Sequence, residues 1–451
     1  MFAVKAQWIP QNAGFTNDTL GFYELSIPNK NTAWAVCFDP RFGVNAGKFI
    51  QDFTRTTNGG ATWIPGKVGN DRTLQIANIS AIDEKEAWVA MNKRFVTGGG
   101  LYHTTNAGIT WEKSNPTEIF DENSYPNFVH FRTDGPGKAR NKGLAQGDPN
   151  GGYWEIYTTT NGGKKWHRVP QSALPAALPG EFGWLSGFYA VGETVWFGTS
   201  GGRMFKTDDL GKTWSAYTVV PPGTGFVMEI AFNDDKLHGV THLRNNQGTF
   251  LYATADGGVT WTNLGQPAFW KPSRITAVPG TNALLSTGIS GNRAWVGTAI
   301  SYDNGATWTE LENVTQRTVS RFYDAETGYG CSAFITGPPL RGGIWKSAIV
   351  FQDPAQEAKI TKMEHLKITT DQLTVYPIPT NDVVHVVLQD VFVNARSVVS
   401  IISMDGRVLE SKTSSGTKTI QLNVSKLPAG IYTVRIVSNA QVTNRMITIS
   451  R

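Results

Sequence analysis

The chain has few cysteines, no long apolar run and no concentrated charge of either sign. Only two of its 451 residues are cysteine, Cys37 and Cys331, which excludes a disulfide-rich scaffold and a metal site made of cysteine alone. No apolar segment approaches the roughly 20 residues that a membrane-spanning helix needs, so we expect no transmembrane span. Lysine and arginine exceed aspartate and glutamate by only five, without a basic cluster, which argues against nucleic-acid binding.

Glycine and tryptophan are abundant instead, with 48 and 15 residues. Together with many short stretches of apolar and β-branched residues, this composition favours short strands and tight turns over helices. The chain is also longer than a typical single domain. We therefore expect an all-β protein with two or more domains.

One eight-residue pattern, which we name the box, occurs six times. Its form is Ser/Thr-x-Asp/Asn-x-Gly-x-Thr/Lys-Trp, as in TTNGGATW at residues 56–63. In a tight turn an Asn or Asp side chain bonds the nearby backbone and Gly takes a positive φ, so this is turn chemistry and not catalytic chemistry. The expected turn formers are the third residues of the boxes: Asn58, Asn106, Asn161, Asp209, Asp256 and Asp303.

The spacing of the boxes predicts a propeller. Successive box tryptophans, from Trp63 to Trp308, are 48, 55, 48, 47 and 47 residues apart. A strand-rich repeat of about 40–50 residues is typical of β-propeller blades. Residues 319–347 repeat the unit once more without a box, and AQWIP at 6–10 copies ATWIP at 61–65. We therefore predict seven blades, with the strand around Trp8 completing the last one and closing the ring.

This ring would make the two cysteines neighbours. Cys37 and Cys331 lie in corresponding strands of the first and seventh blades, so a disulfide between them and two free, buried thiols are the alternatives. His238 and His242 are four residues apart in KLHGVTHL, but no third ligand is nearby. We interpret both histidines as strand residues and predict no metal site and no cofactor.

After the predicted propeller the composition of the sequence changes. A polar segment of mixed charge at 353–371 is predicted to be a linker. Residues 372–451 contain β-branched strands separated by turns, which predicts a small immunoglobulin-like β-sandwich. At the other end, residues 1–6 are either the remnant of a signal peptide or a frayed terminus. The expected propeller therefore covers residues 7–352.

The box resembles the Asp-box, or bacterial neuraminidase repeat, of sialidases, sortilin-type receptors, some xyloglucanases and photosystem II stability/assembly factors. The seven-fold count and the tryptophan-rich strands look most like the last of these. This resemblance implies an architecture and not an activity. A sialidase would also need an arginine triad, a Tyr and Glu pair and an Arg-Ile-Pro motif, none of which is recognisable in the sequence.

The last 80 or so residues resemble the type A sorting domain of the type IX secretion system of Bacteroidetes. The match covers a YPIP opening, with isoleucine in place of the family's asparagine, a DGRV turn and an LPAGIY segment: Tyr376, Pro377, Pro379, Gly406, Gly430 and Tyr432. The resemblance implies export by the type IX machinery through residues 372–451, followed by release or attachment to the outer cell surface. The alternative is an ordinary accessory sandwich domain.

The segments that lead from one blade to the next converge on one end of the central channel and carry aromatic and basic side chains. These would suit a glycan, an acidic peptide or an anionic polymer, through stacking and charge-assisted hydrogen bonds. Alternatively, several of the aromatics plug the channel or pack between blades. The candidate binding residues are Arg72, Tyr125, Phe182, Trp184, Phe226, Trp270, Arg274, Arg317 and Arg321.

We predict a secreted or surface-displayed, non-catalytic binding protein for a glycan, a protein or a surface polymer. One alternative is a secreted glycoside hydrolase of sialidase-like or xyloglucanase-like architecture, and another is an assembly or scaffold factor of a surface complex. A glycosidase needs two carboxylates about 5–10 Å apart. The sequence pairs no such residues, so no catalytic residue is assigned and enzymatic activity stays open.

Overall fold

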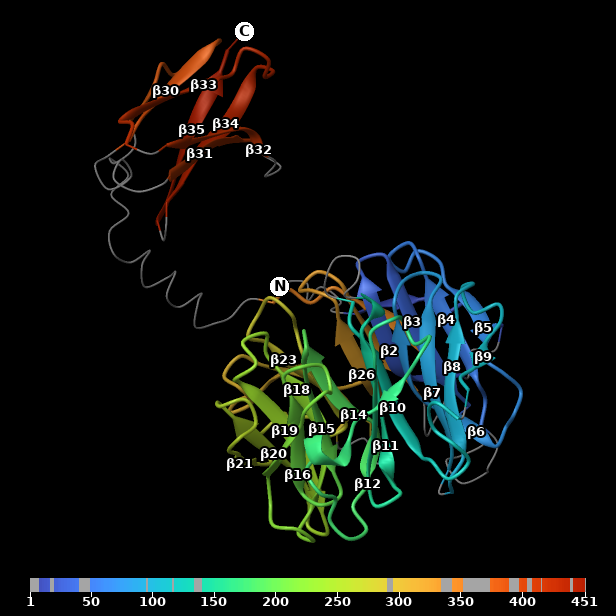
Figure 1. The fold of residues 1–451 in the computed structure, drawn as a ribbon. Helices are drawn as coiled ribbons and strands as arrows, with labels where there is room; N and C mark the ends of the chain where they lie inside the picture. Colours follow the sequence, from blue (N-terminus) through green and yellow to red (C-terminus); the bar gives the residue numbers. More distant parts are fainter. Residues whose placement is uncertain are drawn as a thin grey trace. The chain divides into compact units, whose positions relative to one another are not determined.

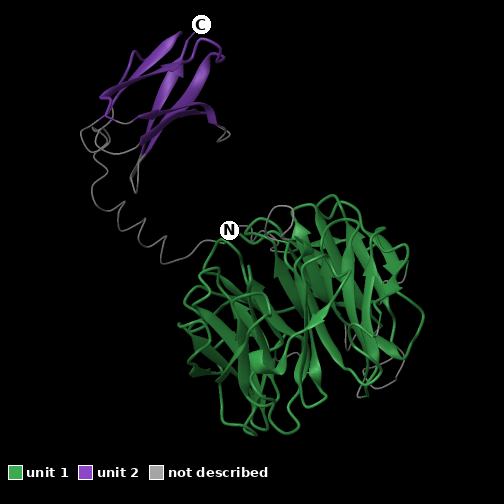
Figure 2. Cartoon of the chain, viewed as in Figure 1, with its two compact units in different colours: residues 1–354 green, residues 355–451 purple. Residues whose placement is uncertain are grey.

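The structure is a computed structural model, and it describes residues 8–16, 20–39, 49–94, 96–115, 117–133, 140–289, 295–333, 343–351, 374–388, 397–403, 408–414, 416–438 and 441–450. The chain forms two compact units, residues 1–354 and 355–451 (Figure 2). Over the described residues it contains strands, a 3-10 turn at Gln171–Ala173 and no α-helix. Within that part of the chain, no helix has the length and apolar character needed to cross a membrane. The predictions for residues 1–6, 353–371 and Gly406 fall outside the described residues.

The described residues of the first unit form seven four-stranded antiparallel sheets, which are the blades. Six blades are meanders of consecutive strands, and in the seventh the fourth strand comes from the start of the chain. Blades 1 to 4 are β2(Gly21–Asn29), β3(Thr32–Phe38), β4(Asp52–Thr56), β5(Ile64–Lys67); β6(Leu74–Ala81), β7(Ala87–Lys93), β8(Gly99–Thr104), β9(Glu112–Lys113); β10(Pro126–Phe131), β11(Gly143–Asn150), β12(Tyr153–Thr159), β13(His167–Arg168); and β14(Gly183–Val191), β15(Thr194–Thr199), β16(Arg203–Thr207), β17(Ser215–Thr218). Blades 5 to 7 are β18(Phe226–Phe232), β19(Gly239–Asn245), β20(Gly248–Thr254), β21(Thr262–Gly265); β22(Arg274–Ala277), β23(Leu284–Gly288), β24(Gly297–Ser301), β25(Thr309–Glu312); and β26(Arg317–Phe322), β27(Gly328–Ser332), β28(Gly343–Ser347), β1(Trp8–Gln11).

The first strands of the blades line the centre of a closed ring (Figure 1). Each first strand contacts the first strand of the next blade, and β26 of blade 7 contacts β2 of blade 1. The second strands are buried on both faces: all six residues of β15, TVWFGT, are buried. A strand covered on both sides is expected to be a continuous apolar run, which explains segments such as TAWAV and TVWFG. The predicted fold class is confirmed.

Each box forms the turn between the third and fourth strands of its blade. In the first box, Thr56 Oγ1 accepts a hydrogen bond from the backbone N–H of Gly60 (3.0 Å). Asn58 Oδ1 accepts one from the backbone N–H of Thr62 (2.9 Å). The same two bonds occur in the other five boxes. The box side chains thus bind the backbone of their own turn.

The box also joins each blade to the blade before it. Gly163 has φ +78°, and a Cβ at this position would lie 2.3 Å from the ring of Trp88 in blade 2. Gly108 likewise leaves no room for a Cβ, which would lie 2.2 Å from Phe53 in blade 1. Trp166 then packs edge-on against Trp88, with ring centroids 5.8 Å apart. Both the backbone angle and the close approach therefore require glycine in the box.

Contacts between blades 6 and 7 hold β1, the outermost strand of blade 7, in place beside β28. Trp8 Nε1–H donates to Thr298 Oγ1 (3.2 Å), and the Thr298 hydroxyl donates to Glu312 Oε1 (3.2 Å). Arg317 Nε–H donates to the same Glu312 oxygen (2.7 Å). The Arg317 guanidinium lies over the rings of Trp8 and Trp345, 4.7 and 4.6 Å from their centroids. We name these five residues the seam network, because they connect blade 6 to blade 7 and to its strand β1.

Of the two alternatives for the cysteines, the disulfide is wrong. Cys37 and Cys331 are free, and both are buried in the apolar cluster between blades 1 and 7 that also contains Trp63 and Tyr329. Burial raises the pKa of both thiols well above the usual value. The protonated thiol packs here as a small apolar side chain.

The second unit is a β-sandwich around a core of valine, leucine, isoleucine and tyrosine. Its opening segment is fixed to the last strand by backbone hydrogen bonds of Thr380 with Thr448 and Ser450. The hydroxyl of Tyr432 donates to the carbonyl of Pro428 (2.9 Å). One sheet has the order β29-β30-β33 and the other β32-β31-β34-β35. The strands are β29(Thr374–Tyr376), β30(Val383–Val387), β31(Ser397–Ile402), β32(Val408–Ser414), β33(Thr419–Asn423), β34(Gly430–Ser438) and β35(Gln441–Ile449).

Candidate functional site

The two ends of the propeller are built from different connections. The first strand of each blade begins where the fourth strand of the preceding blade ends, and the second and third strands are joined at this same end, which we name the mouth end. The boxes and the connections between first and second strands lie at the opposite end, the box end. Eight of the nine predicted binding residues precede or begin a first strand and therefore lie at the mouth end. The ninth, Arg321, lies further along β26.

Three of the predicted aromatics form one cluster at the mouth end, between blades 4 and 5. The ring centroids of Phe182 and Trp184 are 5.2 Å apart, and those of Trp184 and Phe226 are 5.7 Å apart. Phe182 and Phe226 remain 38% and 41% exposed. The indole N–H of Trp184 has no hydrogen-bond partner among the described residues. We name these three residues the aromatic cluster.

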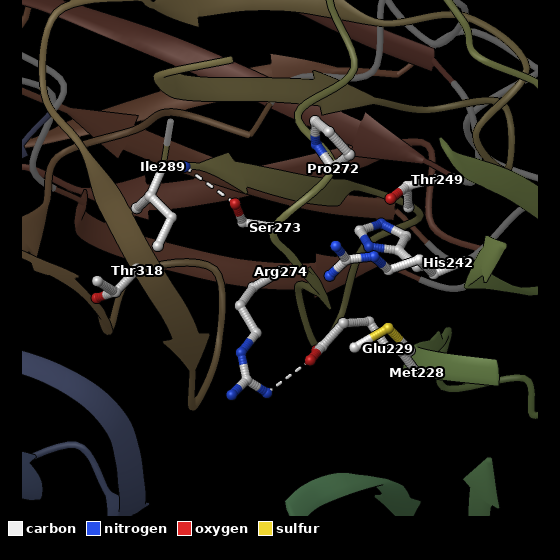
Figure 3. A pocket seen from close by; sticks show the side chains of 10 residues that line it. Met228, Glu229, His242, Thr249, Pro272, Ser273, Arg274, Ile289 and Thr318 are labelled. Carbon is white, nitrogen blue, oxygen red and sulfur yellow. Dashed lines mark hydrogen bonds and ion pairs between the residues drawn. The ribbon is translucent and has the colours of Figure 1, made fainter. Parts of the chain in front are cut away.

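A pocket of about 260 Å³ lies beside the aromatic cluster, where blades 5, 6 and 7 meet at the mouth end (Figure 3). Phe226 of the cluster is paired in register with Arg244, which lines this pocket. We name it the mouth pocket. The polar side chains that line it and bear on its chemistry are Glu229, His242, Arg244, Thr249, Ser273 and Arg274.

His242 is buried in the wall of the mouth pocket with one ring nitrogen unused. The indole N–H of Trp270 donates to His242 Nε2 (3.2 Å), which assigns the imidazole proton to Nδ1. Burial, and then the nearby charge of Arg274, lower the pKa of His242 to about 3, so the ring is neutral at physiological pH. The side chain is 1% exposed, yet Nδ1 has no hydrogen-bond partner among the described residues. The wall of the mouth pocket therefore contains a buried imidazole N–H without a described partner.

An ion pair forms another part of the lining. Arg274 Nη1 lies 2.7 Å from Glu229 Oε1, and Figure 3 shows the two side chains joined below His242. Burial raises the pKa of Glu229 to about 6, against the opposing effects of Arg274 and Arg321. Arg244 is exposed and has no ion-pair partner among the described residues. The pocket thus contains one compensated arginine and one uncompensated arginine.

A second polar group crosses the central channel. Ser186 Oγ of blade 4 donates to Glu24 Oε2 of blade 1 (2.6 Å). Arg321 Nη2 lies 3.9 Å from the other oxygen of Glu24. Arg321 therefore belongs to the interior of the channel, where its charge faces Glu24.

Sequence reasoning missed both glutamates of these groups, although a signal was present. Glu24 and Glu229 are the only charged residues in their strands, GFYELSIPN and FVMEIAF, and each is the fourth residue of a first strand. In both ladders a register shift directly precedes the glutamate. Bulges re-aim side chains, so a lone carboxylate after a bulge in an inner strand indicates a channel residue.

Two of the predicted binding residues are buried and pack within the fold. Arg317 is 2% exposed because it fills the seam network, and Trp270 is 5% exposed because it packs between blades against His242. For these two residues the packing alternative applies. Arg72 and Tyr125 lie at the mouth end near blades 2 and 3 and do not line the mouth pocket.

The two histidines of KLHGVTHL do not act together. His238 Nδ1 lies 2.6 Å from Asp235 before β19 begins, whereas His242 bonds Trp270 further along the strand. Over the residues that the structure describes, no three His, Cys, Asp or Glu side chains gather as metal ligands.

Comparison with known families identifies the second unit. Residues 374–450 match the family described as the secretion system C-terminal sorting domain. The chain carries a C-terminal sorting domain. The resemblance of the tail is thereby confirmed, and so is the predicted localisation: the protein is exported by the type IX secretion system and is secreted or attached to the outer cell surface.

The chain is also similar to a curated enzyme. It is 24% identical over 320 residues to xyloglucanase Xgh74A from Acetivibrio thermocellus, an alignment that covers 59% of this chain and 35% of the enzyme. A second sequence of Xgh74A from the same species gives the same values. The chain therefore spans only about a third of the length of the curated relatives that it matches.

Solved structures show the same fold at low sequence identity. YCF48 from Cyanidioschyzon merolae superposes with a TM-score of 0.50 and 15% identity, over 76% of this chain and 99% of that one. The GH74 enzyme of Niastella koreensis superposes with a TM-score of 0.45 and 14% identity, over 94% of this chain and 65% of the enzyme. The similarity to YCF48 shows a shared β-propeller fold.

Proposed function

We propose that the propeller is a non-catalytic glycan-binding module of a secreted protein, with the aromatic cluster and the mouth pocket as its ligand site. One observation carries the proposal. The exposed ring of Phe226 is paired in register with Arg244, an exposed arginine of the mouth pocket, and Trp184 and Phe182 continue the aromatic surface from there. Arg244 has no ion-pair partner among the described residues. An available cationic donor beside exposed aromatic rings favours a ligand that has both acceptors and apolar faces.

Sugars combine these two properties. A sugar ring has apolar C–H faces, which pack on aromatic rings, and a rim of hydroxyl groups, which bond polar groups in a pocket. The volume of about 260 Å³ is smaller than the roughly 300–1,000 Å³ of pockets that enclose a whole drug-sized ligand. The site therefore fits one unit of a polymer in the mouth pocket, with neighbouring units over the aromatic cluster. Export to the cell surface brings the propeller into contact with such polymers.

Replacing two rings of the aromatic cluster tests this proposal. We expect the full chain to bind glycans on an array, and Trp184→Ala with Phe226→Ala to weaken that binding at least about tenfold, because buried aromatic contacts dominate binding energies. Affinity would be measured by calorimetry on the best array ligand, with thermal melting as the check on folding.

Ile109→Ala is the matched control. Ile109 is an apolar side chain, 80% exposed, in a box turn at the opposite end. The proposal is contradicted by a folded double variant with unchanged affinity, or by a chain that binds no glycan.

Glycoside hydrolysis is the second candidate, and Glu229 is the observation that favours it. Its carboxyl lines the mouth pocket and has a pKa of about 6, which suits a general acid. The similarity to Xgh74A points to the same class of reaction. If the chain is a hydrolase, reducing ends will be released from xyloglucan or other β-glucans, and Glu229→Gln will abolish this release. Binding without release on any substrate would leave the non-catalytic function in place.

A further inference from the structure

We propose that the mouth pocket selects a carboxylated sugar, a hexuronate unit of an acidic glycan. This inference rests on the proposed glycan-binding function and adds the chemical group that the pocket recognises. It comes from the charge balance of the lining and from the position of Arg244 on β19.

The lining of the mouth pocket carries one net positive charge. Two arginines and one glutamate contribute formal charges, and His242 is neutral. Arg274 is already compensated by Glu229, at 2.7 Å. Arg244 is exposed and lacks an ion-pair partner among the described residues. The guanidinium of Arg244 is therefore the group available to an anionic ligand.

A neutral side chain lies on the same strand and the same side. Residues two apart in a strand point to the same face, so His242 and Arg244 of β19 both line the pocket from one face. A carboxylate accepts about four hydrogen bonds, enough for a two-pronged contact with the Arg244 guanidinium. A sugar hydroxyl carries no charge and can form neither the ion pair nor the two-pronged contact.

The remaining polar groups suit the hydroxyls of the same sugar. The Ser273 oxygen accepts the backbone N–H of Ile289 (2.9 Å), which leaves the Ser273 proton to donate. Thr249 presents a second hydroxyl to the pocket. On the open side, Phe226 is paired in register with Arg244, so an aromatic ring adjoins the position of the carboxylate.

A peptide would fit this surface less well. Peptides are commonly bound by adding a strand to a free sheet edge or by laying a helix in an apolar groove. The mouth end is made of connecting segments, and each first strand there is already paired within its blade. The pocket is lined by hydrogen-bonding side chains, and the exposed ring of Phe226 is paired in register with one of them, Arg244, which suits a chain of sugars.

The test compares an acidic glycan with its own neutral form. The full chain would be titrated calorimetrically with oligogalacturonate and with the same oligosaccharide after its carboxyl groups have been reduced to alcohols. We expect the reduced form to bind at least about tenfold more weakly, because charge-assisted bonds are the strong ones. A glutamate-rich peptide with a free terminal carboxylate serves as the competing anion.

Two variants locate the effect. Arg244→Ala should lower the affinity for oligogalacturonate about tenfold and remove most of the preference over the reduced form. Lys164→Ala, which deletes an exposed positive charge at the box end, should change neither. Arg244 is exposed, so thermal melting should be unchanged in the Arg244 variant.

Each outcome decides the proposal. Equal affinity for the acidic and reduced oligosaccharides overturns the selection of a carboxylate and leaves the glycan-binding function standing. Failure of both oligosaccharides and of every array glycan overturns both. Peptide binding that displaces oligogalacturonate with higher affinity assigns the pocket to acidic peptides and overturns the sugar. Preference for oligogalacturonate that Arg244→Ala removes and Lys164→Ala keeps supports the proposal.

Discussion

The two ends of the propeller use their polar side chains differently. At the box end, Asp256 accepts a hydrogen bond from the backbone N–H of Thr260 (2.9 Å) and another from the Thr260 hydroxyl (2.6 Å). The corresponding bonds of Asp303 and Thr307 are the same. At the mouth end, the exposed Arg244 of the mouth pocket has no ion-pair partner among the described residues.

This difference separates stability from recognition within one fold. A box turn uses the acceptors of its Asp or Asn side chain on its own residues, and the same turn is repeated in six of the seven blades. The mouth end varies from blade to blade, and there the exposed ring of Phe226 is paired in register with the exposed Arg244. Substitutions at the box end should therefore change stability, and substitutions at the mouth pocket should change affinity.

We expect the largest loss of stability from a substitution of Arg317, because this residue lies at the mouth end but belongs to the seam network. Arg317→Ala removes the partner of Glu312 and the cation between two tryptophan rings. We expect a loss of about 3–5 kcal/mol in the free energy of unfolding, typical of breaking a buried ion pair. Urea denaturation followed by tryptophan fluorescence measures it.

Arg244→Ala is the matched control at the same end, and its effect on stability should stay within about 0.5 kcal/mol because the side chain is exposed. If the two alanine variants were equally stable, the seam network would not be holding the ring closed.

Asp303 gives the next largest effect, at the box end. Asp303→Ala leaves the backbone N–H of Thr307 without its acceptor. We expect a loss of about 1–2 kcal/mol, similar to the loss of a helix-capping side chain, with unchanged affinity for the best glycan ligand. Unfolding and calorimetric titration of the same preparation measure both. Glu118→Ala, an exposed carboxylate at the mouth end, is the control for charge. A change in affinity at Asp303 without loss of stability would reverse the assignment of the two ends.

The repeated part of the fold could be predicted from the sequence because its information is local. Each box brings its turn former, its glycine and its tryptophan within eight residues, so the pattern can be counted. Trp8 could be placed for the same reason, since its neighbours copy those of Trp63. The sorting domain likewise has short motifs in a fixed order, and the family match covers residues 374–450.

The mouth pocket could be predicted only in part, because its chemistry depends on residues that meet across the ring. Ser186 and Glu24 are separated by 162 residues and lie in blades 4 and 1. Trp270 and Phe226 both come from connections at the mouth end, yet one is buried against His242 and the other is 41% exposed. The sequence of a connecting segment shows which aromatic it carries, but the packing of adjacent blades decides where that ring lies.

The smallest effect compares the boxes with one another, because three have aspartate and three have asparagine in the same geometry. Although burial raises the pKa of Asp256, hydrogen bonds from Thr260, Thr254 and Val259 outweigh it and lower the pKa to about 2. Hydrogen bonds lower the pKa of Asp209 and Asp303 in the same direction.

A carboxyl whose pKa is lower in the folded state stabilises the fold above its unfolded pKa of about 3.9, and this contribution is lost as the pH falls through the folded pKa. Asparagine does not titrate, and Asn58 Nδ2 donates to Thr62 (2.9 Å) where aspartate accepts from threonine. Replacing Asp209, Asp256 and Asp303 by asparagine should therefore flatten the decline in melting temperature between pH 4 and pH 2. The control is Asp208→Asn, which should not flatten it: Asp208 is the second residue of the fourth box, and its carboxylate accepts from the Thr194 hydroxyl (3.0 Å) and not from its own turn. If melting temperature falls with pH in the same way for the unchanged chain, the triple variant and the Asp208 variant, the box acids contribute no pH-dependent stability.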